Sequence, residues 1–340
     1  MSRRALFLAA CLAAVATAPL AARADAVADF YSGKVVSLII ASGEGGYDAY
    51  GRLMARHLSK HIPGNPTMIA QQMPGAGGLQ GINHVYNVAP RDGTVIGLVR
   101  RSAILSHITQ PGATRFDIGK MNWLGNIAAE FPVSTAWHTA KAKRFEDLLK
   151  TELIVGGTGT SSVHETTPRL FNALIGTKYR IVGGYKGSGD LDLAMERGEI
   201  DGIAYDSWSN VKLRKADMLR RELLHVTLAF GLERNPELPA APFALDFAKN
   251  EDDRQLMRLF FAQDAAARPM IAPPGVPADR LAALRRAFMA LAGDADFLGD
   301  AQRSNLLIGL DDDRYMATII DMVVTTPPAL VDRLNRITTP

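Results

Sequence analysis

Short apolar runs, each followed by a glycine-rich loop and an amphipathic stretch, fill the first hundred residues. The run at 35–41 (VVSLIIA) is continuous, which is typical of a strand buried on both faces. Apolar residues at helical spacing follow it, with Asp48 in the position of an N-cap. Runs at 67–72 and 94–99 predict two more strands, with a helix ending near Val88 between them. This alternation predicts a parallel sheet covered by helices.

The same rhythm returns in the middle of the chain. Strands are predicted over 153–156, 179–183 and 200–205, and helices over 165–174 and 190–197. A more helical region follows, with apolar residues spaced i, i+3 and i+4. Its segments are 252–262, 278–291 and 312–324. The pattern therefore predicts an α/β protein with two units of similar construction.

The N-terminal pattern indicates an export signal. Two arginines precede an apolar run, small residues follow, and an A-x-A pattern predicts cleavage after Ala24 or Ala26. Residues 1–26 are therefore predicted to be a signal peptide, removed from a soluble chain that works in the periplasm. One alternative is a lipoprotein signal in which Cys11 carries the lipid, and another is a helix that the mature chain retains.

Cleavage of this signal peptide would change the net charge of the chain. The whole chain has 38 Lys and Arg against 35 Asp and Glu, a formal net charge of +3. Loss of Arg3, Arg4 and Arg23 leaves as many basic as acidic residues, and loss of Asp25 as well leaves one positive charge. The chain has no dense Lys/Arg stripe, so we do not expect it to bind nucleic acid. With 47% hydrophobic residues it is expected to fold, and its single cysteine excludes internal disulfides and cysteine metal sites.

Four glycine-rich loops carry the main chemical signal, because each lies between a strand end and a helix start. They occupy 42–46, 74–78, 157–162 and 185–189. Exposed backbone N–H groups and helix N-termini at such loops bind carboxylates or phosphates without a cationic side chain. Two units that face each other with these loops would form a cleft for an anion. The alternative is that the glycines serve backbone geometry alone.

Common signatures of catalysis are missing from the sequence. The loop at 157–162 lacks the third glycine of a dinucleotide fingerprint, and neither a phosphate-binding P-loop nor a zinc-protease or serine-hydrolase motif occurs. His57 and His61 share a helix face at i, i+4 spacing, which suits either a metal or ordinary packing. We therefore expect no enzyme, no catalytic residues, no cofactor and no metal.

Several side chains of the loops can be interpreted in two ways. Glu44 would repel an anionic ligand, unless it points to solvent or binds a cationic part of the ligand. Tyr47, Tyr185 and Trp208 either line the cleft or pack in the core, and Tyr185 is the strongest candidate because it directly precedes a loop glycine.

Longer motifs follow one another from Tyr31 to about Arg336. They are Tyr47-Asp48 after the first loop, PGAGG at 74–78, APRDGT at 89–94, GGTGT at 156–160, GYKG at 184–187, AMERGEIDG at 194–202 and APPGVP at 272–277. In this order they resemble the periplasmic solute-binding proteins of tripartite tricarboxylate transporters, the TctC or Bug family. The resemblance implies a Venus-flytrap fold of two α/β domains, each a mostly parallel sheet flanked by helices. Residues 27–128 and 263–340 would form domain 1, and 129–262 domain 2.

The resemblance also implies a function. Such a protein captures a small organic carboxylate (a di- or tricarboxylate, an aromatic acid or an acidic amino acid) between its domains. It then delivers the ligand to integral-membrane permease subunits, and we expect it to do so as a monomer. The alternatives are a ligand-sensing protein for a two-component system and, less in keeping with the motifs, an exported enzyme on the same scaffold.

The ligand-binding residues that the resemblance implies come from loops of both domains. They are Gly43, Gly45, Gly46, Tyr47, Asp48, Gly75, Ala76, Gly77, Gly78, Thr158, Gly159, Thr160, Ser161, Tyr185, Gly187, Ser188, Asp206 and Ser207. The chain departs from the family at 42–44, where a proline and more glycine are usual. On this hypothesis a β-branched residue in place of Gly77 abolishes binding and leaves the fold intact.

Overall fold

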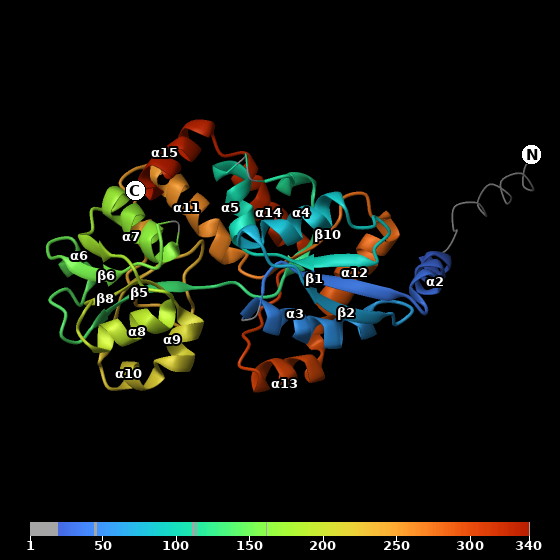
Figure 1. The fold of residues 1–340 in the computed structure, drawn as a ribbon, viewed down its shortest axis with the longest axis horizontal. Helices are drawn as coiled ribbons and strands as arrows, with labels where there is room; N and C mark the ends of the chain where they lie inside the picture. The colour runs from blue at the N-terminus through green and yellow to red at the C-terminus, as the bar shows by residue number, and fades with distance from the viewer. Residues whose placement is uncertain (1–19, 44–45, 111, 113, 161, 340) are drawn as a thin grey trace, which may run out of the picture.

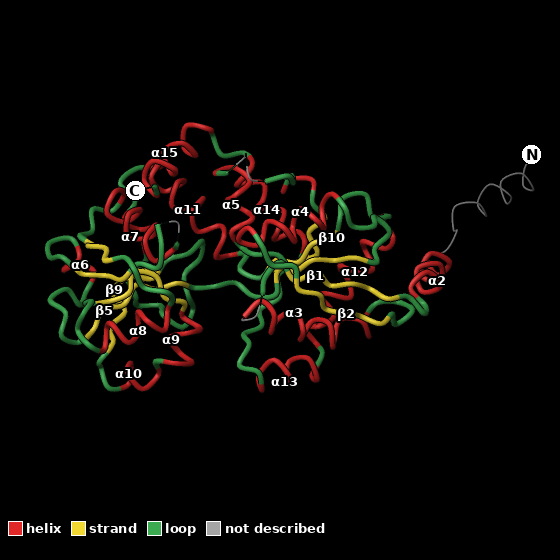
Figure 2. The backbone as a smooth tube through the Cα atoms, in the orientation of Figure 1, coloured by secondary structure: helices red, strands yellow, loops and turns green. Residues whose placement is uncertain are grey.

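The computed structural model describes residues 20–339 except 44, 45, 111, 113 and 161 (Figure 1). It contains two five-stranded sheets, each flanked by helices, that lie next to each other along the long axis of the molecule (Figure 2). Both sheets are mixed, with one strand in each running against the other four. The predicted α/β fold with two mostly parallel sheets is confirmed.

The first sheet has the strand order β2-β1-β3-β10-β4. Its strands are β1 (Val35–Ile40), β2 (Thr67–Gln72), β3 (Val95–Leu98), β4 (Asn122–Asn126) and β10 (Pro269–Ala272). β1 pairs in parallel with β2 and β3, whereas β10 runs antiparallel to β3 and β4. The three strands predicted near the N-terminus are all present, and β4 and β10 were not predicted.

Helices cover both faces of this sheet because β1 is apolar on both sides. Ile39 belongs to a buried cluster with residues of α4 (Leu79–Asn87), α5 (Ser102–Thr109) and α14 (Asp313–Val324). Leu38, its neighbour in the strand, belongs to the opposite cluster with residues of α3 (Gly46–His57), α12 (Ala278–Ala290) and α13 (Ala295–Arg303). Successive side chains of a strand point to opposite faces, so the continuous apolar run predicted this double cover correctly.

The second sheet has the order β7-β6-β8-β5-β9. Its strands are β5 (Pro132–Trp137), β6 (Leu153–Gly156), β7 (Tyr179–Val182), β8 (Gly202–Ser207) and β9 (Leu224–Ala229). Its helices are α6 (Phe145–Leu148), α7 (Val163–Leu174), α8 (Ser188–Glu196), α9 (Trp208–Arg214) and α10 (Ala216–Arg220). β6, β7, β8, α7 and α8 lie where the middle of the sequence predicted them, within a few residues.

Helices also bridge the two halves on one side of the molecule. Figure 1 shows α15 (Pro328–Thr338) above the half with the second sheet, and α11 (Glu251–Ala265) running from there toward α5 of the other half. α15 packs mainly against α7 of the second sheet, although the predicted boundaries place its residues in domain 1. A single buried cluster runs from Ile104 of α5 to Phe171 of α7, so the halves share apolar packing along this side.

Two short segments carry the chain between the sheets, and they are hydrogen-bonded to each other. One joins β4 to β5 and the other joins α11 to β10. The Ile127 amide donates to the Arg268 carbonyl at 3.0 Å, and the Glu130 amide donates to the Asp264 carbonyl at 2.8 Å. Buried Asn126 adds a side-chain bond to the Ala265 carbonyl at 3.0 Å. The paired segments have the position of a hinge.

Two local expectations need correction. Asp48 was predicted as an N-cap, but α3 already begins at Gly46, so Asp48 lies in its first turn and pairs with Arg52 at 2.8 Å. Residues 206 and 207 were expected after a strand, but β8 runs to Ser207, because it pairs with β5 as far as Pro132. Ser207 then caps α9 by accepting from the Asn210 amide.

The predicted signal peptide falls largely outside the described residues, as does Cys11. The described chain begins with α2 (Leu20–Tyr31), which contains both predicted cleavage positions and is held at its end by buried Val27 and Tyr31. Within the described ranges, no helix has the length and apolar character needed to span a membrane.

Candidate functional site

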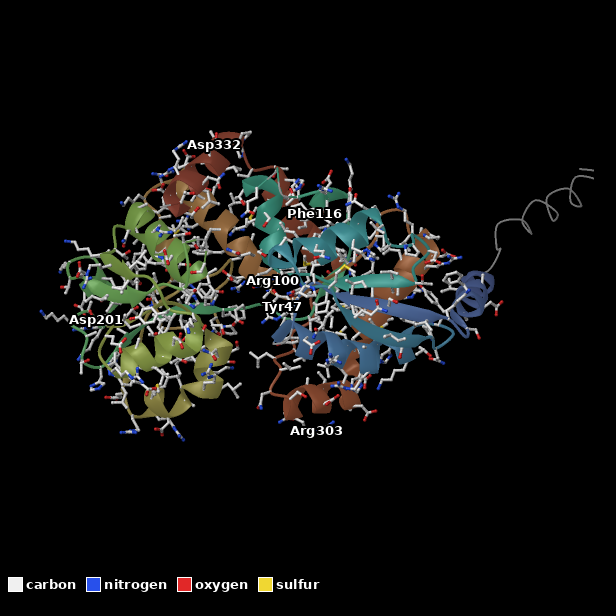
Figure 3. All side chains as sticks on the ribbon, viewed as in Figure 1. Tyr47, Arg100, Phe116, Asp201, Arg303 and Asp332 are labelled. Atoms are coloured by element: carbon white, nitrogen blue, oxygen red, sulfur yellow. The ribbon has the colours of Figure 1, made fainter. Side chains whose placement is uncertain are left out.

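A cavity of about 720 Å³ lies between the two halves of the molecule. Its lining comes from loops and helix starts at the edges of both sheets. The lining residues are Gly46, Tyr47, Arg100, Arg101, Ser102, Glu130, Thr158, Ser162, Val163, His164, Ser188, Tyr205, Asp206, Ser207, Asn210, Arg214, Gln263 and Arg268. Tyr47 and Arg100 are labelled near the boundary of the two halves in Figure 3. We call this space the cleft.

The cleft brings together part of the predicted ligand-binding set. Those lining it are Gly46, Tyr47, Thr158, Ser188, Asp206 and Ser207. Thr160 lines a neighbouring cavity of about 540 Å³ instead. The residues absent from the cleft lining are Gly43, Asp48, Gly75, Ala76, Gly77, Gly78, Gly159, Tyr185 and Gly187. Gly45, Ser161 and Glu44 lie outside the described residues.

The PGAGG loop packs against Arg100, one of the residues that line the cleft. Gly78 has a φ of +99°, and a Cβ there would lie 2.5 Å from Cδ of Arg100 and 2.7 Å from the carbonyl oxygen of Ala41. Only glycine combines this backbone angle with so close an approach. Gly77, by contrast, has open space around its Cα. The structure therefore links this loop to the position of Arg100 through Gly78.

Tyr47 lies between two guanidinium groups at the edge of the first sheet. The ring centroid is 5.6 Å from Cζ of Arg100 and 4.6 Å from Cζ of Arg268. The phenol donates to the Ala267 carbonyl at 2.8 Å and accepts from the Arg101 amide at 3.1 Å. Cation–π contacts of this kind orient a guanidinium without neutralising its charge.

Arg100 and Arg268 keep their charge available to the cleft. Neither makes an ion pair with any carboxylate of the described chain, and Nη1 of Arg268 donates only to the Ala267 carbonyl, at 2.8 Å. Nε of Arg268 is buried and has no hydrogen-bond partner among the described residues. A buried donor without a partner costs about 1–3 kcal/mol, so an anion that accepts from it gains affinity.

A triangle of hydrogen bonds connects both halves at the base of the cleft. Nη1 of Arg101 donates to Oδ1 of Asp264 at 2.8 Å and to the Tyr205 hydroxyl at 2.6 Å. The Tyr205 hydroxyl donates to the same carboxylate oxygen at 2.6 Å. Arg101 follows β3, Tyr205 lies in β8 and Asp264 lies in the last turn of α11, so the triangle joins each sheet to the hinge. Burial raises the pKa of Tyr205, which keeps the phenol protonated as a donor.

Asp264 gives the triangle a dependence on pH. It is fully buried, and burial raises its pKa to about 6 although Arg101 and Tyr205 act in the opposite direction. In the unfolded chain an aspartate ionises near pH 4. The folded protein therefore loses stability as the pH rises from about 4 to 6, because Asp264 ionises more readily in the unfolded chain. Above about pH 6 the stability no longer changes from this cause.

We expect Asp264→Asn to remove this cost. Between pH 4 and pH 7 the free energy of unfolding of the wild type should fall relative to the variant by roughly 2 to 3 kcal/mol, at about 1.4 kcal/mol per pKa unit. Urea unfolding at a series of pH values measures the difference. Asp332→Asn, at an exposed position of α15, is the matched control. If the free energy of unfolding changed with pH in the same way in the wild type and in Asp264→Asn, the raised pKa of Asp264 would be contradicted.

The wall on the side of the second sheet contains a buried ammonium group. Nζ of Lys215 lies 2.5 Å from Oδ2 of Asp206 and 2.5 Å from Oδ1 of Asp192. Nδ2 of Asn210 donates to the other oxygen of Asp206 at 3.0 Å. Asp206 therefore enters the cleft lining as a carboxylate whose charge is already compensated.

Three other polar residues of the cleft lining are Glu130, Thr158 and His164. Glu130 accepts from the Ser209 hydroxyl at 3.1 and 3.2 Å. Nδ1 of His164 and the Thr158 hydroxyl share a hydrogen bond of 2.9 Å. Burial lowers the pKa of His164, so its ring is neutral at neutral pH.

Other candidates from the sequence are accounted for outside the cleft. His57 contacts Asp300 at 3.0 Å and His61 contacts Asp294 at 2.7 Å, so each ring bonds to a different carboxylate. No group of metal-ligating residues occurs within the described ranges. Nε1 of Trp208 donates to Glu237 at 2.8 Å, and Tyr185 packs at the edge of the buried core.

The arginines of the cleft were not predicted from the sequence. Arg100 and Arg101 directly follow a predicted strand, and the tendency of ligands to lie beyond the carboxyl ends of strands was a usable signal for both. Arg268 precedes β10, a strand that was not predicted, and Arg214 ends α9. No pattern in the sequence connects these four positions.

Comparisons with known proteins place this geometry in a known fold. No protein-family model and no curated protein sequence matches the chain. A TctC solute-binding protein from Polaromonas, solved without ligand, matches with a TM-score of 0.69 at 17% identity, over 89% of this chain and 99% of that one. An R. palustris protein solved with adipate matches with a TM-score of 0.60 at 15% identity, over 90% and 97%. MatC from Rhodopseudomonas palustris, solved with malate, matches with a TM-score of 0.56 at 19% identity, over 90% and 99%.

These matches span nearly the whole of each chain. The resemblance recognised in the sequence thus extends to three dimensions: the chain has the two-domain α/β fold of the TctC-type periplasmic solute-binding proteins.

Proposed function

We propose that this chain is a periplasmic solute-binding protein that captures a small organic carboxylate in the cleft. The bound ligand is then delivered to the integral-membrane permease of a tripartite tricarboxylate-type transporter. The domain boundaries at 128/129 and 262/263 belong to the same proposal, since they fall near the two hinge segments. The chain acts as a monomer and without chemistry on its ligand.

The observation that carries the proposal is a pair of guanidiniums that form no ion pair with the described residues. Arg100 and Arg268 line a cavity between two domains, and Nε of Arg268 is buried without a partner among the described residues. Guanidiniums match the planar geometry of a carboxylate and form strong charge-assisted hydrogen bonds with it. The malate and adipate bound to two proteins of the same fold support this class of ligand.

The binding residues that we propose come from the predicted loops and from the arginines of the cleft. From the predicted loops we retain those that line the cleft, and we add the two guanidiniums. The set is Gly46, Tyr47, Arg100, Thr158, Ser188, Asp206, Ser207 and Arg268. Closure of the two domains around a carboxylate would strengthen these contacts, because charges attract more strongly once water is excluded.

A thermal-shift panel tests the proposal. The acids are malate, adipate, citrate, benzoate and glutamate, and the controls are the corresponding amides, which lack the charge. A ligand at 100 times its Kd stabilises the native state by about 2.7 kcal/mol, which raises the melting temperature by several degrees. If no acid shifts the melting temperature more than its amide does, the proposal is wrong.

Two other functions share the same cleft and need their own readouts. An exported enzyme would consume the bound acid, which NMR of the incubated ligand would detect. A sensor for a two-component system would bind the acid equally well but would associate with a kinase ectodomain. Pull-down by the permease subunits on the one hand, and by such an ectodomain on the other, separates transport from sensing.

A further inference from the structure

A second cavity adjoins the cleft and has a different character. It also measures about 720 Å³, and it shares Gly46, Asn210 and Arg268 with the cleft. Its other walls come from α9 on one side and from α13 and the segment after it on the other. Figure 1 shows α9 and α13 on the side of the molecule opposite the bridging helices. We call this space the groove.

The groove is lined by apolar side chains from both halves. They include Tyr50, Leu213, Leu298, Leu306, Leu307 and Ile308. Leu213 is 57% exposed, Leu298 40% and Leu307 46%, which makes them three of the most exposed large apolar residues of the described chain. Single exposed leucines need no explanation, but leucines of two domains that face one cavity mark a site for an apolar group.

The charge of the cleft limits how many carboxylates it compensates. Most of its positive groups have carboxylate partners. The pairs are Arg101–Asp264, Arg214–Asp192 and Lys215–Asp206. Arg100 and Arg268 remain, with Glu130 as the one lining carboxylate outside these pairs. Within the described part of the chain, the cleft therefore has a surplus of one positive charge at neutral pH.

Arg268 connects the two cavities. Its guanidinium lies over the rings of Tyr47 at 4.6 Å and Tyr50 at 5.1 Å, and Tyr50 is itself part of the groove wall. A carboxylate held at Arg268 would thus have the polar cleft on one side and the apolar groove on the other.

We infer that the ligand is a monocarboxylate with an apolar body: its carboxylate binds at Arg268 and Arg100, and its hydrocarbon part occupies the groove against Leu213, Leu298 and Leu307. This inference rests on the proposed function and narrows its substrate class. The groove is continuous with the carboxylate site, so one molecule occupies both. The polar part of the groove lining includes Lys212, but its ammonium already pairs with Glu237 at 2.6 Å. A second carboxylate at the far end of the ligand would therefore lie next to Leu298 and Leu307 with no unpaired cation besides Arg268 among the described groove residues, which is costly.

Calorimetry with straight-chain acids from butyrate to decanoate tests the inference. Burial of each methylene should raise the affinity about 2- to 4-fold until the groove is full, so octanoate should bind at least about tenfold more tightly than butyrate. Suberate, the dicarboxylate of the same length as octanoate, should bind at least about tenfold more weakly than octanoate. If the affinity does not increase with chain length, or if suberate binds more tightly than octanoate, the inference is wrong and the proposed function still holds. Absence of binding by every acid of this series overturns the inference, and the proposed function is overturned as well only if no acid of the thermal-shift panel binds.

Variants of the groove separate ligand binding from domain closure. Leu213→Ser and Leu298→Ser change exposed side chains, and each should reduce the preference for octanoate over butyrate several-fold. Leu193→Ser is the control, because this leucine is 49% exposed on α8 and lines neither the cleft nor the groove. If the leucines only close against one another, the variants will weaken all acids equally and leave the preference unchanged, which overturns the inference.

Discussion

Arg268→Met is expected to weaken carboxylate binding about 100-fold. The substitution keeps an unbranched apolar stem against Tyr47 and Tyr50 and removes only the guanidinium. One charge-assisted hydrogen bond contributes roughly 1.5 to 3 kcal/mol, and about 2.7 kcal/mol corresponds to a factor of 100 in Kd. Isothermal titration with the best acid of the panel measures the loss.

Three companion variants make this result specific. Arg268→Lys retains the charge but not the planar fork, so its affinity should lie between those of wild type and Arg268→Met. Arg100→Met removes the second guanidinium and should also weaken binding. Arg220→Met changes an exposed arginine of α10, remote from the cleft lining, and should bind as the wild type does. Equal affinity of Arg268→Met and wild type would mean that the carboxylate binds elsewhere.

β1 was predicted from its continuous apolar run, whereas β5 was missed because its burial depends on tertiary contacts. β5 reads PVSTAW, and its buried Ser134 and Thr135 interrupt the apolar pattern. The Ser134 hydroxyl accepts a hydrogen bond from the Tyr179 hydroxyl at 2.8 Å, a partner 45 residues away. A buried polar residue is tolerated once it has such a partner, and local sequence does not reveal the partner.

The direction of β10 explains why Arg268 was overlooked. Ligands are expected after the carboxyl ends of parallel strands, a rule that points to residues such as Arg100 at the end of β3. β10 runs antiparallel to β3, so its beginning lies at the edge where β3 ends, and the Val99 amide donates to the Pro269 carbonyl at 3.0 Å. Arg268, directly before β10, therefore reaches the same edge from the opposite direction.

The overall charge concealed the electrostatics of the site. A mature chain with almost equal numbers of acidic and basic residues suggested that backbone N–H groups alone would bind an anion. The fold instead gathers Arg100, Arg101, Arg214 and Arg268 from separate segments into one cavity. Net charge is a sum over the surface, so it carries no information on such local clustering.

Lys215→Met is expected to cause the largest loss of stability. Lys215 is 2% exposed, and its ammonium separates the carboxylates of Asp192 and Asp206, each 2.5 Å away. Methionine keeps the volume of the side chain but leaves two buried negative charges next to each other. Breaking a buried ion pair by removal of one partner costs about 3–5 kcal/mol, and here two carboxylates lose the same partner.

Urea unfolding followed by tryptophan fluorescence measures this loss, since Trp137 and Trp208 both belong to the second half of the molecule. Lys212→Met is the matched control, because Lys212 pairs with Glu237 at the surface and should contribute at most about 1 kcal/mol. The triple variant Lys215→Met, Asp192→Asn, Asp206→Asn should recover most of the stability, because replacing a buried charge cluster by neutral groups removes the unpaired charges rather than the packing. If the triple variant is no more stable than Lys215→Met alone, the loss comes from packing of the lysine stem, and the electrostatic account of this wall of the cleft is wrong.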